Sequence, residues 1–384
     1  MHKLTFYPVG NGDSSQIHLA NGKRLLFDFR QHSQASDSEH PTIDLDRRLR
    51  EELAADKRSD VDVFAITHGD KDHIEGSTEF FELDHAAKYQ GKDRIKVKEL
   101  WVPAALVLDS FAKDSEPHEA KIWRQEARHR LIEGYGVRVF SKPAKLKAFL
   151  ESKGVSLESR EHLITDAGEL VPGFSLATDG VEFFCHSPFI KHCDEGEIQR
   201  NASALIFQVR LSVDGTVTNY FAVGDSESDV LGEIVEITEA KGNDDRLDWD
   251  IYNIPHHCSY LALGPDKGKN STQPTDPVDR LLEHGQRDAY VISSSWPIKN
   301  DKLAYEQTQP PHVQAKNTYV RRLEDVDGRE FMVTMEHKSE TKPQPIEIQV
   351  TGSGVKLSAA IGGAAILVHE RPPRAGVPYA PCFR

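Results

Sequence analysis

Two histidines and two aspartates fall within six consecutive residues of this chain: His68, Asp70, Asp72 and His73. Imidazole and carboxylate groups together are ligands that suit zinc, manganese or iron(II). A loop at the end of a strand can turn several of these side chains toward one point, which a straight strand or helix cannot do for all four. The pattern predicts a metal site; the alternative is a polar loop in which Asp70 or Asp72 caps the next helix.

Other ligand-type residues occupy the same kind of position elsewhere in the chain. Asp28, Asp225, His256 and His257 each stand just after an apolar, strand-like stretch. A capping aspartate or a structural histidine explains any one of them, but it explains the repetition poorly. We therefore expect these side chains to meet in a single cavity.

Short β-prone segments precede these residues and must position them. The expected strands are residues 4–9, 16–19, 24–29, 61–66, 99–102, 136–140, 181–185, 204–210, 218–223, 247–254, 289–293, 330–336 and 346–350. Residues 43–53 are expected to be helical, and so is most of 77–150, most clearly at 119–133, where apolar side chains share one face. This order of elements predicts an α/β protein of layered sheets.

The composition excludes several classes of protein. The 384 residues are 38% hydrophobic and 28% charged, as in ordinary folded domains. No stretch provides the ~20 apolar residues of a membrane helix, so we expect no membrane partner. The net charge of −14 argues against a general clamp for nucleic-acid backbones. The four cysteines form no CxxC pair and the N-terminus lacks a signal sequence, so we expect a cytoplasmic protein.

The motif order resembles that of the metallo-β-lactamase fold superfamily: strand–THxDxDHxxG, then a strand ending in Gly-Asp, then one ending in His. Three details are closer to its ComEC-type branch, the hydrolase-like domain of bacterial DNA-uptake channels and its soluble relatives. Residues 9–15 are similar to that branch's early Gly-x-Gly-Asp turn, and residues 255–259 are similar to its PHHGS. Residues 291–294, followed by His312, are similar to its later strand and downstream histidine.

The resemblance covers about residues 1–320 and implies a four-layer αββα sandwich. On this reading, residues 1–320 are one hydrolase-like domain with a helix-rich insertion at about 77–150. Residues 321–384 are then a β-rich C-terminal extension with a Pro-rich tail, which could bind a protein partner.

The resemblance also implies a role for each matched residue. It implies one or two divalent ions, zinc or manganese. Their implied ligands are His68, Asp70, Asp72, His73, Asp225 and either His256 or His257. The implied catalytic residues are Asp72, at the metals, and His312, at the leaving group. The residues expected to support the ligands or to contact the substrate are Asp13, Asp28, Asn201, Ser259 and Ser294.

Three departures from the superfamily pattern affect the first metal site. Asp70 stands where many members have histidine, which adds hard oxygen and shifts preference toward manganese. Asn201 stands in place of the middle histidine, for which His186 is an alternative. Cys258 replaces the glycine of PHHGS, where the backbone normally approaches closely. A single-metal or unoccupied first site therefore stays open.

The expected function is hydrolysis by a metal-activated water, with a phosphodiester or other small anionic substrate. Nucleic acid fits as a substrate, although not through a basic surface. One alternative belongs to a different class: a scaffold or sensor that kept the fold, lost the chemistry and acts through a partner. The other alternative is a hydrolase of the same fold that acts on lactone, thioester or β-lactam bonds.

Overall fold

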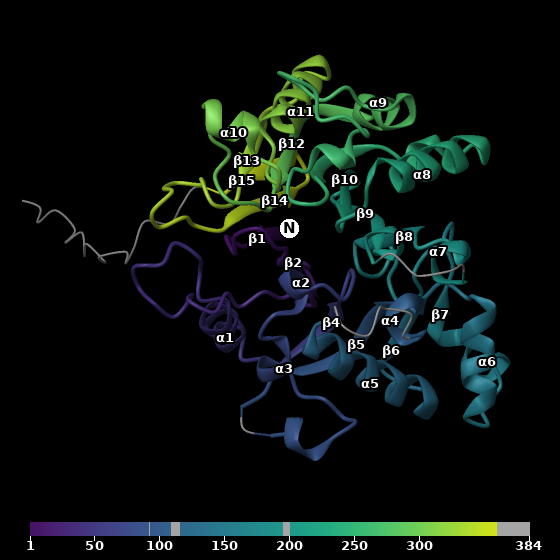
Figure 1. The fold of residues 1–384 in the computed structure, drawn as a ribbon. Coiled ribbons are helices and arrows are strands. Elements are labelled where there is room, and N and C mark those ends of the chain that lie inside the picture. The colour runs from purple at the N-terminus through teal and green to yellow at the C-terminus, as the bar shows by residue number, and fades with distance from the viewer. Residues whose placement is uncertain (92, 109–115, 195–199, 359–384) are drawn as a thin grey trace, which may run out of the picture.

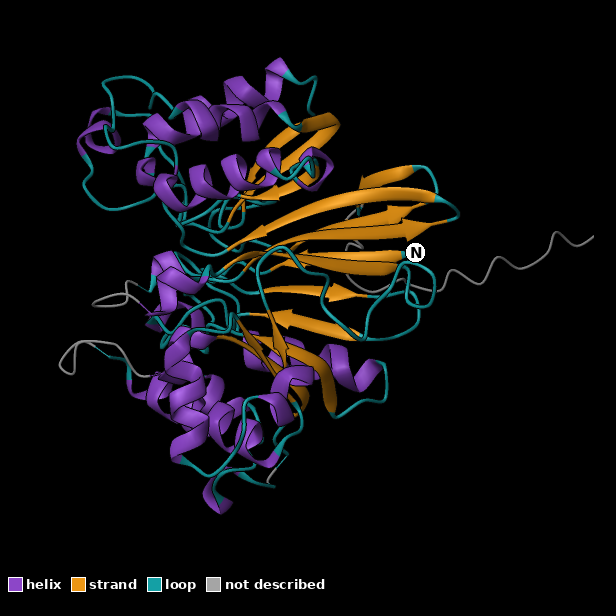
Figure 2. Ribbon diagram, turned by 90° about the vertical axis from the view of Figure 1, so that its right-hand side faces the viewer, coloured by secondary structure: helices purple, strands orange, loops and turns teal. Residues whose placement is uncertain are grey.

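The computed structural model describes the whole chain except residues 92, 109–115, 195–199 and 359–384. The Pro-rich tail predicted from the sequence lies outside the described residues. Strands form two sheets in the middle of the molecule, and most helices lie above and below them (Figure 2).

The strands divide unequally between the sheets. The nine-stranded sheet has the order β15 (Gly354–Leu357), β14 (Ile346–Thr351), β1 (His2–Phe6), β2 (Ser15–His18), β3 (Arg24–Phe27), β4 (Asp60–Ala65), β5 (Lys96–Pro103), β6 (Val137–Phe140) and β7 (Ile164–Thr165). The six-stranded sheet has the order β13 (Glu330–Val333), β12 (Gly285–Ser293), β11 (Trp249–Asn253), β10 (Thr216–Val223), β9 (Ile206–Val213) and β8 (Val181–Ser187).

Helices cover the outer face of each sheet. Those packed on the nine-stranded sheet are α1 (Leu45–Ala55), α2 (Lys71–Ile74), α3 (Ser77–Phe80), α4 (Ala104–Leu108), α5 (His118–Glu133) and α6 (Ala144–Ser152). Those on the six-stranded sheet are α8 (Ser228–Ala240), α9 (Asp276–Glu283), α10 (Lys302–Glu306) and α11 (Val313–Asp325). The short helix α7 (Ile190–Asp194) contacts α4. Short 3-10 helices lie at Ala87–Tyr89, Glu158–Leu163, Asn201–Ser203, Asp244–Arg246 and Tyr260–Ala262.

Three separate apolar clusters hold these layers together. Side chains alternate along a strand, so β4 turns Val63 and Ala65 toward the other sheet and Phe64 toward the helices. The cluster between the sheets joins residues such as Phe27 and Phe207, whose rings meet edge to face at 6.1 Å. The outer clusters join each sheet to its own helices. This is the four-layer αββα order, and the predicted fold class is confirmed.

Parallel strands aim the ends of several elements at one edge. Strands β3 to β7 run parallel to one another, and so do β10 to β13. Ligands in such sheets bind outside the carboxyl ends of the strands. Strand β3 ends two residues before its expected end because Asp28 adopts a left-handed backbone, with φ +54°. That turn leaves Asp28 at this edge.

The segment after residue 320 contributes strands to both sheets. β13 pairs with β12, and β14 pairs with β1, so the first and last parts of the described chain lie side by side (Figure 1). The division into residues 1–320 and 321–384 stays a prediction. None of the helices in the described part of the chain is long and apolar enough to cross a membrane.

A buried carboxylate on α5 fixes the loop that follows α3. Glu126 accepts hydrogen bonds from the backbone N–H groups of Asp84 and His85 and from Nε of Arg130, the last at 2.6 Å. Burial alone would raise its pKa, but the bond from the His85 ring and the charge of Arg130 lower it to about 2.

We expect Glu126→Gln to destabilise the fold by roughly 3 kcal/mol at pH 7, since each pKa unit is worth ~1.4 kcal/mol. The pKa is lower in the folded chain, so this stability is present above the unfolded pKa and is lost as pH falls through about 2. Urea unfolding at pH 7 and at pH 3 should show the deficit shrinking in acid. Glu133→Gln, an exposed change on the same helix, is the control; an equal deficit at both pH values would contradict this account.

Candidate metal centre

Four buried side chains from four segments converge between the two sheets. Asp13, His73, Asp225 and His257 each offer one ligand atom, and these atoms all lie within 4.8 Å of one another. Nε2 of His73 lies 3.3 Å from Oδ1 of Asp225, and Nε2 of His257 lies 3.3 Å from Oδ2 of Asp225. The carboxylate of Asp225 therefore stands between two imidazoles.

The ends of strands bring these four residues together. Asp13 lies in the loop between β1 and β2, and His73 lies on α2, the short helix that begins six residues after β4 ends. Asp225 follows β10 by two residues, and His257 follows β11 by four. The expectation that separate strand ends meet in one cavity is met for these residues.

Asp28 holds His73 from behind. Its Oδ2 lies 2.7 Å from Nδ1 of His73, so that ring donates there and turns Nε2 toward the centre. Thr67 donates to both oxygens of Asp28, from its backbone N–H at 2.7 Å and from its hydroxyl at 2.6 Å. Both sides of the carboxylate are thus held, and His73 has one orientation.

We expect Asp28→Asn to weaken metal binding by about 10- to 100-fold, the usual cost of losing a partner behind a ligand. Asparagine tolerates the left-handed backbone of this position, so the fold should survive. A competition titration against a zinc-binding dye measures the affinity. The control is Asp62→Asn, at the other end of β4, where the carboxylate pairs with Arg58. An unchanged affinity in Asp28→Asn would remove Asp28 from the centre.

A strained turn places His257. His256, His257 and Cys258 have φ of +50°, +52° and +66°, three left-handed residues in succession without a glycine. Such conformations cost roughly 1–3 kcal/mol each and persist where the surroundings enforce them. Nδ1 of His257 bonds to the carbonyl of Ser294 at 2.9 Å, so Nε2 faces Asp225 and lies 3.2 Å from Oδ2 of Asp72.

Buried ligand atoms that face the centre indicate that it fits a cation. Nε2 of His68 is buried and makes no hydrogen bond, and Nε2 of His73 and Oδ1 of Asp225 have only each other, at 3.3 Å. Buried polar atoms without partners are rare and call for an explanation such as a missing ion. Two imidazoles and two carboxylates form a set that suits zinc or manganese. The residues present therefore fit a divalent metal.

The charges of the four groups are strongly linked. Burial would lower the pKa of His257, but Asp225 and Asp72 outweigh it and raise that pKa to about 10. Burial would raise the pKa of Asp225, but the imidazoles of His257 and His73 hold it well below its usual range. Burial raises the pKa of Asp13. The negative charge of Asp225 and the positive charge of the two imidazoles therefore stabilise one another.

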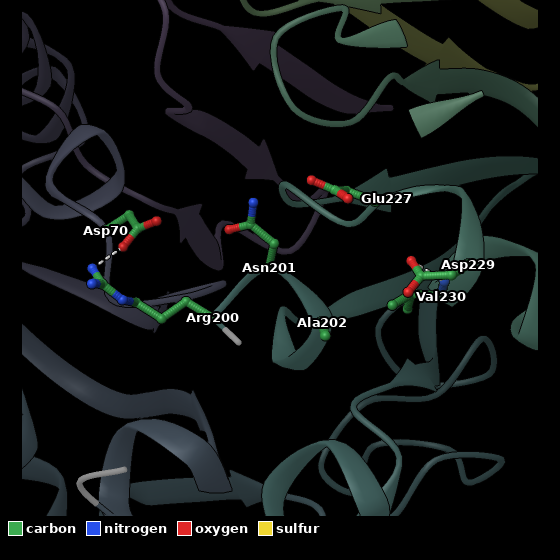
Figure 3. Close-up of a pocket in the computed structure, with 7 residues that line it drawn as sticks. All are labelled: Asp70, Arg200, Asn201, Ala202, Glu227, Asp229 and Val230. Carbon is green, nitrogen blue, oxygen red and sulfur yellow. Dashed lines mark hydrogen bonds and ion pairs between the residues drawn. The ribbon is translucent and has the colours of Figure 1, made fainter. Parts of the chain in front are cut away.

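The other predicted ligands of the Thr67–Gly76 segment lie beside this group. His68 Nε2 is 3.6 Å from Oδ2 of Asp70 and 3.9 Å from Oδ2 of Asp225. The other oxygen of Asp70 is bonded by Nη1 of Arg200 (Figure 3). Arg200 and Asp70 line a cavity of about 260 Å³ together with Asn201, Ala202, Glu227, Asp229 and Val230.

Of the two neighbouring histidines, His257 joins the four-residue group and His256 does not. His256 Nδ1 lies 4.0 Å from Oε1 of Glu227, and its side chain is 22% exposed. The alternative ligand His186 lies elsewhere. Its Nε2 bonds to the carbonyl of Arg246 at 2.9 Å, and its ring packs against Phe221.

The remaining predicted residues contact the turn at residues 256–258 or the segments next to it. Ser259 Oγ accepts the backbone N–H of Leu261 at 3.3 Å, so its hydroxyl caps a 3-10 helix. Ser294 Oγ donates to Asn253 at 3.3 Å. His312 is 1% exposed, and its Nδ1 accepts the N–H of Tyr260 at 3.3 Å. Burial lowers its pKa, and a backbone hydrogen bond with Thr308 opposes that shift.

Sequence reasoning missed two features of the centre. It placed Asp13 at the substrate or behind the ligands, whereas the structure puts Asp13 in the four-residue group. It did not single out Arg200, although the adjoining Asn201 was named. Arg200 directly precedes Asn201, which stands where the superfamily pattern has a metal-binding histidine. A basic residue beside a replaced ligand could have marked Arg200 as a candidate.

Comparison with known proteins gives distant likenesses only. The sequence matches no family model and no curated protein. Among solved structures, the chain is similar to a diphosphatase from the PhnP family at 13% identity and a TM-score of 0.31, covering 77% of this chain and 87% of that one. It is similar to unliganded yeast PDE1 at 11% identity and a TM-score of 0.40, covering 86% and 97%.

A third likeness is to the metallo-β-lactamase SMB-1, solved with 2-mercaptoethanesulfonate. The identity is 13% and the TM-score 0.27, over 66% of this chain and 79% of that one. These likenesses are too distant to assign an activity. The function proposed below depends on this chain's own residues.

Proposed function

We propose that this chain is a metal-dependent hydrolase that cleaves a phosphodiester bond in a small anionic substrate. The observation that carries the proposal is the buried group of Asp13, His73, Asp225 and His257 at the carboxyl ends of strands from both sheets. The sequence resemblance to the ComEC-type branch supports the phosphodiester. That branch assignment itself stays a prediction.

The chain's own residues have distinct tasks in this reaction. A divalent ion held by the four residues would lower the pKa of a water and draw charge from the scissile group. Asp28 and the Ser294 carbonyl hold the two imidazoles so that each turns Nε2 to the centre. Asp72 sits beside His257 and accepts a proton from the attacking water. His312, which the sequence resemblance places at the leaving group, is the candidate proton donor to the leaving oxygen.

The cavity beside the centre favours a small substrate. Its lining contains one guanidinium, from Arg200, and three carboxylates, from Asp70, Glu227 and Asp229. Together with the net charge of −14, this lining would repel a long polyanion. We therefore favour a cyclic nucleotide, or the end of a strand presented by a partner, over duplex nucleic acid.

The test is hydrolysis of bis(4-nitrophenyl) phosphate by protein purified without chelator. We expect turnover that chelation abolishes and that manganese or zinc restores. A chromogenic β-lactam and a lactone, assayed beside it, separate the alternative hydrolases. Metal-loaded protein that turns over none of the three would contradict the proposal and favour the scaffold or sensor reading.

A further inference from the structure

We propose that Arg200 takes the place of a second metal ion, so that the centre holds one divalent ion and uses a guanidinium as its second cation. The number of metal ions bound is inferred from the arrangement of the side chains at the centre, whatever reaction the protein catalyses. The part of the inference that concerns the substrate rests on the proposed function.

The two halves of the centre are built differently. On one side, Asp13, His73, Asp225 and His257 bring four ligand atoms within 4.8 Å, and among the described residues this is the one group of that kind. On the other side, His68 Nε2 lies 3.6 Å from Asp70 and 3.9 Å from Asp225, but neither His68 nor Asp70 belongs to a set of three or more ligand atoms that all lie this close to one another. The first half fits a metal, whereas the second half lacks a converged donor set.

Arg200 lies on the side of the centre with His68 and Asp70, where the metal-ligand atoms do not converge. Its Nη1 bonds to Oδ1 of Asp70, and Figure 3 shows that pair on one side of the cavity and Glu227 on another. Arginine stays protonated at all ordinary pH values. A second ion bound by His68 and by the other oxygen of Asp70 would lie close to this permanent positive charge, which would repel it. Asn201 stands in place of the superfamily's middle histidine. Its neutral amide is a weaker metal ligand than an imidazole.

The guanidinium also faces the substrate. Arg200 lines the same cavity of about 260 Å³ as Asp70 and Asn201. Arginine binds phosphate oxygens through its planar fork and stabilises the charge that develops on a phosphoryl group. With one ion on the side of Asp225 and Arg200 on the other, the anionic group of a phosphodiester lies between two cations.

Metal stoichiometry tests the inference without any assay of activity. Protein dialysed against excess Mn²⁺ and then gel-filtered should retain about one ion per chain, with the paramagnetic resonance spectrum of an isolated ion. Arg200→Ala removes the cation bonded to Asp70, and retention should rise toward two with a spin-coupled spectrum. Arg200→Lys, which keeps a cation there, is the matched control and should stay near one.

Each outcome distinguishes this inference from the proposed function. Two ions in the unaltered chain would overturn the inference and leave the hydrolase standing, whereas no ion at all would overturn both. If Arg200→Ala does not fold, Asp70→Asn serves instead. We expect it to keep its single ion at unchanged affinity, and loss of that ion would make Asp70 a ligand and overturn the inference. A count that stays at one in folded Arg200→Ala would also overturn it.

Discussion

Asp225→Asn should lose its metal and, with it, about 1,000-fold or more of the rate of phosphodiester hydrolysis. Asp225 lies 3.3 Å from both His73 and His257, so its carboxylate contacts both imidazoles of the group. The amide keeps the shape and removes the charge. Losing about 4 kcal/mol of transition-state stabilisation slows a reaction about 1,000-fold. Metal content and kcat/KM on bis(4-nitrophenyl) phosphate measure the two effects.

Asp248→Asn provides the control for this change. Asp248 precedes β11 at the opposite end from the centre and pairs with His284 at 3.0 Å. It should keep both metal and rate. If Asp225→Asn retained its metal and hydrolysed at the original rate, the four-residue group would not be the catalytic centre.

Asp13→Asn should lower metal affinity by about 100-fold or more, because Asp13 offers one of the four ligand atoms that converge at the centre. Asp13 is buried, and burial raises its pKa, so the bare carboxylate is costly there unless a cation neutralises it. Titration with Zn²⁺ and a competing dye measures the affinity, and steady-state kinetics at saturating metal measure KM. If Asp13 instead contacts the substrate, one of the two roles expected from the sequence, the variant should have a higher KM for substrate and an unchanged metal affinity.

Much of the layered fold could be predicted from the sequence because the pattern is local. An apolar run such as β4 predicts a strand, and the polar residues after it mark the strand's carboxyl end. Parallel strands bring such ends to one edge, which is why Asp28, His73 and Asp225 could be named together. The order of strand-rich, helix-rich and again strand-rich segments along the chain predicts layers of sheets and helices.

The choice between His256 and His257 could not be made from the sequence. Neighbouring residues in an extended chain point in opposite directions, so the pattern alone allows either. The decision comes from three successive left-handed residues, which turn His257 inward and leave His256 partly exposed. That conformation is enforced by tertiary contacts, such as the bond from His257 to the carbonyl of Ser294.

The contact between Asp70 and Arg200 and the position of Asp13 in the centre also depend on tertiary packing, so local sequence patterns could not give either one. Arg200 is 130 positions from Asp70, and no periodicity links them. Asp13 reaches the centre only because the loop between β1 and β2 lies at the same edge as the turns after β10 and β11. Each contact depends on how the two sheets face one another, which local patterns do not encode.

The central claim concerns the position of one metal ion, and an anomalous difference map from crystals grown with Zn²⁺ or Mn²⁺ measures that position directly. The account predicts a single strong peak enclosed by Asp13, His73, Asp225 and His257, with ligand atoms at about 2.0–2.2 Å. A map with no peak there, or with its peak among residues outside this group, would contradict it.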